Sequence, residues 1–237
     1  TTDSQEYRDL WIPFLRSFAA HQKEKGWFDR TVIAMDERAL DAMQDAYRIA
    51  QEAAPGIKMS LAGNYHKELV DKIYDYCIAW KQQFTPEDLA LRNSKGWIST
   101  SYTACPDAMP NVGSNNEPIE ATYLPLYCIA NGFNGFLRWA WMNWTDNPMY
   151  DSRFKLFTPG DTYIVYPGNH SSRRFEHIIR GVQNVAKIET LRKEYKQKRN
   201  QKALLQLEDT LSQFKNPTPN EAELRENIYK IELLLNK

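Results

Sequence analysis

The segment from Thr31 to Glu37 places the strongest constraint on how this chain folds. It reads Thr-Val-Ile-Ala-Met and then two adjacent carboxylates, Asp36 and Glu37. The first five residues are apolar or β-branched and predict a buried strand, and residues 38–53 continue with a helical, amphipathic pattern. Buried carboxylates are costly unless they are paired or used, and α/β folds bind ligands at the carboxyl ends of strands. The two acids therefore indicate a site at the end of this strand.

The rest of the chain alternates predicted strands and helices. The predicted strands cover residues 31–35, 57–62, 73–79, 97–103, 133–141 and, as a short segment, 163–166. The predicted helices cover residues 4–25, 38–53, 85 onward, 119–131, 173–197, 204–214 and 221–235. Such alternation predicts a parallel sheet. Five main strands with outer helices match the later units of an α/β, (β/α)8 TIM-type barrel, and an open, doubly wound sheet is the alternative.

The length of the chain limits how much of a barrel it can contain. A complete barrel takes about 250 residues, or about 31 per unit, so five units use only part of the 237 residues. We therefore expect residues 1–195 to form the C-terminal part of a catalytic barrel and residues 196–237 to form a helical tail. We also expect a second polypeptide or an N-terminal segment to supply the first barrel strands. A first residue that is Thr1 rather than Met indicates a processed, trimmed or partial chain.

Composition argues against several classes of protein. Thirty basic and thirty acidic residues give a net charge of zero, so the chain lacks the basic character of a nucleic-acid-binding protein. It has no run of about 18 apolar residues, so we expect no membrane span. The three cysteines form no CxxC motif, and the four histidines show no metal-ligand spacing. We therefore expect neither a metal nor a cofactor.

The predicted strand ends carry residues that suit a carbohydrate. Besides Asp36 and Glu37, the candidate substrate-binding residues are Asn64, Tyr102, Trp139, Trp141, Asn143 and Trp144. Aromatic rings pack against the apolar face of a sugar, amides and carboxylates meet its hydroxyls, and glycoside hydrolysis requires a pair of carboxyl groups. Trp139 shares a strand face with Leu137, so filling of the barrel interior is its alternative role. This set predicts a glycosidase.

The adjacency of Asp36 and Glu37 favours one mechanism within that class. Neighbouring strand residues point to opposite faces, so both reach one pocket only where the strand turns into a loop. Most retaining glycosidases hold two carboxyl groups about 5–5.5 Å apart, usually on different strands. A contiguous pair instead suits substrate assistance, in which the 2-acetamido oxygen of the sugar attacks the anomeric carbon. One carboxylate then holds the acetamido N–H and the other protonates the leaving group.

Several motifs recur in the order that one enzyme family has them. They are the strand ending in Asp36-Glu37, Ser101–Pro106 with Pro110-Asn111, Gly135–Trp141 with Asn143 and Trp144, Gly160-Asp161, Tyr166–Gly168, and Ser172, Arg174–Glu176 and Gly181. On these motifs, residues 32–193 resemble the C-terminal part of the catalytic domain of glycoside hydrolase family 123, the β-N-acetylgalactosaminidases. The resemblance implies a retaining, substrate-assisted exo-hydrolase of terminal β-linked N-acetylgalactosamine, exported from the cell. It also implies that Glu37 is the acid/base and that Asp36 orients the acetamido group.

Other interpretations stay open at this point. Asp36 can be no more than the N-cap of a helix that begins at Arg38, and Glu37 can pair with Arg38 or Lys58 at the surface. At the level of function, one alternative is a non-catalytic carbohydrate-binding or structural relative of the same barrel. Another is a glycosidase that acts on a sugar without an acetamido group.

Overall fold

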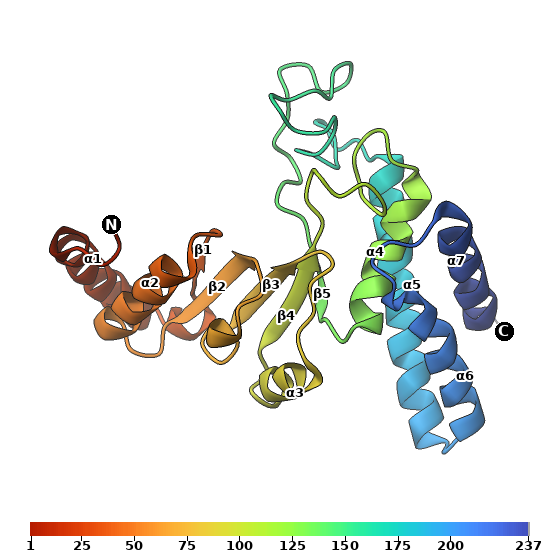
Figure 1. The fold of residues 1–237 in the computed structure, drawn as a ribbon, viewed down its shortest axis with the longest axis horizontal. Coiled ribbons are helices and arrows are strands. Elements are labelled where there is room, and N and C mark those ends of the chain that lie inside the picture. The colour runs from red at the N-terminus through yellow and green to blue at the C-terminus, as the bar shows by residue number, and fades with distance from the viewer. Residues whose placement is uncertain (237) are drawn as a thin grey trace. The chain divides into compact units, whose positions relative to one another are not determined.

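The computed structural model describes residues 1–236 and divides the chain into two compact units, Thr1–Thr100 and Ser101–Lys237 (Figure 1). The strands of the sheet are hydrogen-bonded in the order β1-β2-β3-β4-β5. This order follows the chain and lacks the reversal that defines a doubly wound sheet. The expected α/β fold with consecutive βα units is therefore confirmed, and closure into a barrel stays a prediction.

The first unit contains three complete parallel strands with their helices. Its elements are α1 (Gln5–Glu24), β1 (Val32–Met35), α2 (Leu40–Ala53), β2 (Lys58–Gly63), β3 (Asp75–Ala79), α3 (Pro86–Ser94), the start of β4 (Ile98–Tyr102), and short 3-10 helices at Phe28–Arg30 and Lys67–Leu69. Val32 of β1 lies beside Lys58 of β2, and Ser60 of β2 lies beside Asp75 of β3, in parallel register. The carboxyl ends of these strands therefore share one edge, where the predicted site residues follow β1 and β2.

A buried arginine holds the middle of this unit together. Arg92 of α3 is completely buried. It donates hydrogen bonds to the hydroxyl of Ser99 and to the backbone carbonyls of Val70, Ile73, Tyr74 and Ile98. Aromatic rings surround the guanidinium, namely those of Tyr76, Phe84 and Trp97. Burial lowers the pKa of Arg92 to about 10, so the group stays charged at neutral pH and connects α3 with the segments around β3 and β4.

The second unit is mainly helical. Its elements are the end of β4, α4 (Pro118–Ala130), β5 (Gly135–Leu137), α5 (Arg173–Gln197), α6 (Gln201–Ser212), a 3-10 helix at Gln213–Lys215, and α7 (Glu221–Leu235). Helices α4 and α5 approach closely at Gly181, where an added Cβ would lie 2.7 Å from the carbonyl oxygen of Thr122. Only glycine fits at such a crossing. The predicted helices at 173–197 and 221–235 are confirmed, and the one predicted at 204–214 begins earlier, at Gln201.

Two predicted strands differ from the observed backbone. The strand expected at 133–141 ends at Leu137, because the next residue, Arg138, is buried against the carbonyls of Thr103 and Asp161. The segment expected as a strand at 163–166 makes only isolated bridges, one of them between Tyr163 and Met142. Both differences arise from contacts between segments distant in sequence, which a local hydrophobic pattern does not report.

Candidate functional site

The two adjacent carboxylates follow β1 directly, as the sequence predicts. Asp36 is exposed over 72% of its side chain, and its Oδ2 lies 2.7 Å from Nη1 of Arg38. The same guanidinium donates to the backbone carbonyl of Glu37 at 2.6 Å. Arg38 therefore ties the turn after β1 together, because it contacts both residues of the acidic pair.

The two purely structural roles considered for these acids, helix capping by Asp36 and surface ion pairing by Glu37, are both wrong. Helix α2 begins at Leu40, and its N-cap is Ala39 without a side-chain capping bond, so Asp36 does not cap it. Lys58 does not pair with Glu37, because its Nζ donates to the carbonyl of Asp29 at 2.6 Å. Within residues 1–236 the carboxylate of Glu37 forms no ion pair. Both acids thus keep carboxylate oxygens available to a ligand.

The end of β2 lies directly against Glu37. A Cβ added to Gly63 would lie 2.8 Å from Cβ of Glu37 and 3.4 Å from its Cα. Contacts under 3 Å between such atoms are not tolerated, so residue 63 has to lack a side chain for the two strand ends to approach. The ends of β1 and β2 therefore form one continuous rim that carries Asp36, Glu37 and the next residue of β2, Asn64.

Asn64 is exposed at this rim, and neighbouring residues hold its position. Its Oδ1 accepts a hydrogen bond of 2.8 Å from Nε2 of Gln82, and its backbone carbonyl accepts one of 2.6 Å from the hydroxyl of Tyr76. Sequence reasoning missed Gln82, although its position in the loop after β3 is the place where a rim residue belongs. The first unit thus brings together three predicted site residues, namely Asp36, Glu37 and Asn64.

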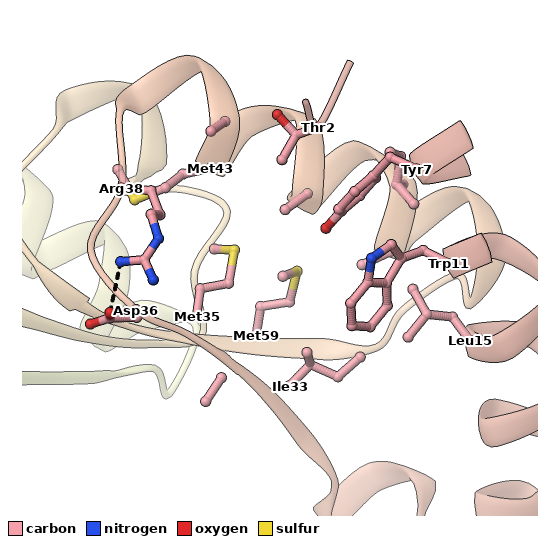
Figure 2. A pocket seen from close by; sticks show the side chains of 15 residues that line it. Thr2, Tyr7, Trp11, Leu15, Ile33, Met35, Asp36, Arg38, Met43 and Met59 are labelled. Carbon is pink, nitrogen blue, oxygen red and sulfur yellow. Dashed lines mark hydrogen bonds and ion pairs between the residues drawn. The ribbon is translucent and has the colours of Figure 1, made fainter. Parts of the chain in front are cut away.

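A mostly apolar cavity of about 500 Å³ lies beside Asp36 in the first unit. Figure 2 shows the pair of Asp36 and Arg38 on one side of this cavity and the rings of Trp11 and Tyr7 on the other. Its wall continues through side chains of α1, α2, β1 and β2, among them Leu15, Ile33, Met35, Met43 and Met59. Burial raises the pKa of Tyr7, in keeping with the apolar surroundings. Asp36 therefore borders an apolar, indole-lined hollow as well as solvent.

The second unit carries the other predicted substrate-binding residues. Tyr102 is the last residue of β4, and Trp139, Trp141, Asn143 and Trp144 lie on the segment that follows β5. Trp144 is 39% exposed, and its Nε1 donates to the carbonyl of Val165 at 2.8 Å. The backbone N–H of Asn143 donates to the carbonyl of Thr162 at 3.1 Å, and its side chain is exposed. These bonds hold the segment in place while leaving Asn143 and the Trp144 ring accessible.

The two remaining tryptophans occupy different surroundings. Trp141 is half-buried, packs edge-on against Phe175 with ring centres 5.9 Å apart, and lines a cavity between α4, β5 and α5. Trp139 is 45% exposed and lies 5.1 Å from the ring of Phe157. In the second unit, Trp139 and Trp144 therefore offer more ring surface to a ligand than Trp141 does.

A buried ion pair supports the tryptophan segment. Arg138 and Asp161 pair through side chains that are 0% and 1% exposed, and the other carboxylate oxygen of Asp161 accepts a bond from Trp139. Asp161 belongs to the Gly160-Asp161 motif, which the sequence singled out without assigning it a role. The ion pair explains its place there, because it connects the end of β5 to the loop that precedes α5.

The described part of the chain holds neither a metal-binding cluster nor a membrane-spanning helix. Within residues 1–236 no group of three His, Cys, Asp or Glu side chains is arranged to hold a metal ion. In the same range, no helix has the length and apolar character needed to cross a bilayer. All three cysteines are free, with Cys77 and Cys128 buried and Cys105 partly exposed.

Paired carboxyl groups at the carboxyl ends of strands in an α/β sheet are typical of glycoside hydrolases. Residues 1–191 match the family model described as "Glycoside hydrolase 123, catalytic domain". The chain therefore belongs to glycoside hydrolase family 123. No curated protein matches the chain.

A solved structure shares this fold. It is a family 123 glycoside hydrolase from Clostridium perfringens, analysed for the details of glycolipid glycan hydrolysis. It aligns with a TM-score of 0.85 and 25% sequence identity over 100% of this chain and 45% of its own length. This chain thus spans less than half of that protein.

Proposed function

We propose that this chain carries the catalytic carboxylates of a retaining, substrate-assisted glycosidase that removes terminal β-linked N-acetylgalactosamine from glycans. One observation carries the proposal. Asp36 and Glu37 stand side by side at the carboxyl end of β1, in a chain whose residues 1–191 match the catalytic domain of family 123. A contiguous pair of this kind suits a reaction in which the substrate supplies its own nucleophile.

Each acid has a separate task in this reaction. Asp36 accepts the acetamido N–H through Oδ1, while Arg38 occupies its Oδ2. The acetamido oxygen then attacks the anomeric carbon, the glycosidic bond breaks, and Glu37 gives its proton to the departing oxygen. In the second step Glu37 takes a proton from water, which opens the oxazoline intermediate with overall retention of configuration.

The substrate and location belong to the same proposal. The Clostridium perfringens relative was analysed for its action on glycolipid glycans, so glycans ending in N-acetylgalactosamine are the substrates we propose. We also propose that the protein is exported, and that the remaining barrel strands come from an N-terminal segment or a second polypeptide.

The test uses Glu37→Gln and Asp36→Asn in the full-length protein with a nitrophenyl β-N-acetylgalactosaminide. We expect Glu37→Gln to lower kcat by about 10²- to 10⁴-fold and Asp36→Asn to lower it nearly as much. Glu24→Gln, at an exposed position near the end of α1, is the control and should retain the rate. Wild-type rates in both acid variants would refute the assignment. Binding of the sugar without turnover by the wild type would favour the non-catalytic alternative.

A further inference from the structure

We infer that Gln82 is a positioning residue that fixes the side-chain amide of Asn64 as a hydrogen-bond donor toward the bound sugar. This inference rests on the proposed function, because it takes Asn64 to meet the substrate at the rim beside Asp36 and Glu37. It assigns a role to a residue outside the predicted site and a direction to one inside it.

The hydroxyl of Tyr76 forms hydrogen bonds to the backbone of the loop after β2. This tyrosine is completely buried. Its hydroxyl donates to the carbonyl of Asn64 at 2.6 Å and accepts from the N–H of His66 at 2.8 Å. Burial raises the pKa of Tyr76 to about 12, so the hydroxyl keeps its proton at neutral pH. The main chain from Asn64 to His66 therefore has one fixed course.

The side-chain amide of Gln82 forms a hydrogen bond to the backbone of this loop at one end and to the side chain of Asn64 at the other. The backbone N–H of Tyr65 can only donate, and it donates to Oε1 of Gln82 at 2.5 Å. The other end of that amide, Nε2, must then face Asn64, where it donates to Oδ1 at 2.8 Å. An amide has one acceptor end and one donor end, so the orientation of Gln82 determines the orientation of Asn64.

The donor end of Asn64 is what remains for a ligand. Its backbone carbonyl and Oδ1 are both engaged, whereas Nδ2 has no hydrogen-bond partner within the described residues 1–236. An amide NH₂ group binds acceptors, such as a sugar hydroxyl oxygen, and cannot accept a hydrogen bond. Asn64 thus complements the carboxylate of Asp36, because a carboxylate can only accept.

A second contact keeps the loop from shifting. The hydroxyl of Tyr65 donates to Oδ2 of Asp88 at 2.8 Å, and Asp88 is 1% exposed and pairs with Lys67. Burial, together with the bond to Asp88, raises the pKa of Tyr65 to about 12, so this donor is also permanent at neutral pH. With Tyr65 anchored at both its ring and its N–H, Gln82 has a fixed partner to orient it.

The decisive variant is Gln82→Glu. At neutral pH the new carboxylate can accept from the N–H of Tyr65, but it has no donor for Oδ1 of Asn64. The Asn64 amide should then reverse, turning its NH₂ toward residue 82 and its oxygen toward the sugar. A protonated carboxyl regains one donor and one acceptor, so lowering the pH through its pKa should restore the original arrangement.

Kinetics of the full-length protein report this reversal. We expect Gln82→Glu to raise KM for the nitrophenyl β-N-acetylgalactosaminide about tenfold at pH 7, with a smaller effect on kcat. The ratio of variant to wild-type KM should fall toward one as the pH is lowered, and taking the ratio removes the enzyme's own pH profile. Gln206→Glu, at an exposed position of α6 in the second unit, adds the same charge and should give a ratio near one at every pH. A pH-independent ratio for Gln82→Glu would overturn the inference.

A spectroscopic readout separates this inference from the proposed function. In ¹⁵N spectra the Asn64 side-chain NH₂ resonance, identified by its loss in Asn64→Asp, should shift downfield in Gln82→Glu at pH 7 and return at low pH. An unshifted resonance in a folded Gln82→Glu protein would refute the positioning role. The expected shift with an unchanged KM would show that Asn64 does not meet the sugar, which also refutes the inference. The expected shift in a protein whose Asp36 and Glu37 variants stay fully active would instead refute the proposed function alone.

Discussion

Trp139 is tethered by Asp161, whose Oδ2 accepts a 2.9 Å hydrogen bond from the indole Nε1. The other oxygen of the same carboxylate pairs with Arg138, and both partners of that ion pair are buried. One acidic side chain therefore does two things, since it balances a buried charge and orients a half-exposed indole. The stability of the second unit and the geometry of its aromatic segment depend on the same residue.

Asp161→Asn should destabilise the second unit strongly. The substitution nearly preserves shape but leaves the guanidinium of Arg138 charged and without its carboxylate, and breaking a buried pair in this way costs about 3–5 kcal/mol. Urea denaturation followed by tryptophan fluorescence measures the change. Asp146→Asn, on the exposed part of the same segment, should change stability by no more than about 0.5 kcal/mol. Equal stabilities of the two variants would contradict this account of the ion pair.

A thiazoline mimic of the oxazoline intermediate should inhibit the full-length enzyme tightly. The mimic resembles the cyclised sugar of a substrate-assisted reaction, and transition-state-like ligands bind far more tightly than substrates. Asp36→Asn should weaken this inhibition, because the side chain that holds the acetamido nitrogen then has one acceptor oxygen in place of a carboxylate. The measurement is a comparison of the inhibition constants of the wild type and of Asp36→Asn. Absent inhibition of an active wild type would point to a sugar without an acetamido group.

The contact between α5 and α6 should weaken in acid. The hydrogen bond from Arg192 lowers the pKa of Glu208, with Nε and Oε1 2.7 Å apart. A carboxylate whose folded pKa is depressed stabilises the fold above its unfolded pKa and loses that contribution as the pH falls through the folded value. Denaturation midpoints should therefore fall as the pH is lowered below about 4.5, the ordinary pKa of a Glu side chain. Arg192→Met should reduce this drop, and Lys202→Met, at an exposed position of α6, should not.

Only one of the three thiols should react in the native protein. Cys77 and Cys128 are each 1% exposed, and burial raises the pKa of Cys77 to about 12, so little thiolate forms at pH 8. Cys105 is partly exposed. Titration with a disulfide reagent should show one fast thiol, lost in Cys105→Ser, and three thiols after unfolding in denaturant. Three fast thiols in the folded protein would contradict the observed burial.

Local sequence patterns predicted the elements that local patterns control. The apolar run before Asp36 ends where β1 ends, and the acid pair lies directly beyond it. The run also predicted a buried strand, and this part was wrong, because β1 is at most half-buried and exposes Val32. The capping interpretation of Asp36 failed because α2 begins later than its amphipathic pattern, with Ala39 as the N-cap. A few residues at a helix boundary are beyond the resolution of such patterns.

The missed features all depend on partners that are distant in the sequence. Gln82 and Asn64 are 18 residues apart, and Arg138 and Asp161 are 23 residues apart. In both cases the neighbouring sequence predicts only an ordinary polar surface residue, and the partner of the side chain becomes known from the fold. The same reason explains why β5 is shorter than predicted. The local pattern around Arg138 is that of a strand, but its guanidinium pairs with the distant carboxylate of Asp161.

The bare backbone at Gly63 gives the rim an unusual sensitivity. A single methyl group there would collide with Glu37. The position of the proposed proton donor therefore depends on residue 63 having no side chain. A displacement of about 1 Å in an active site can cost about a hundredfold in rate. Replacement of Gly63 by any residue with a side chain should therefore displace Glu37 and lower the rate of turnover.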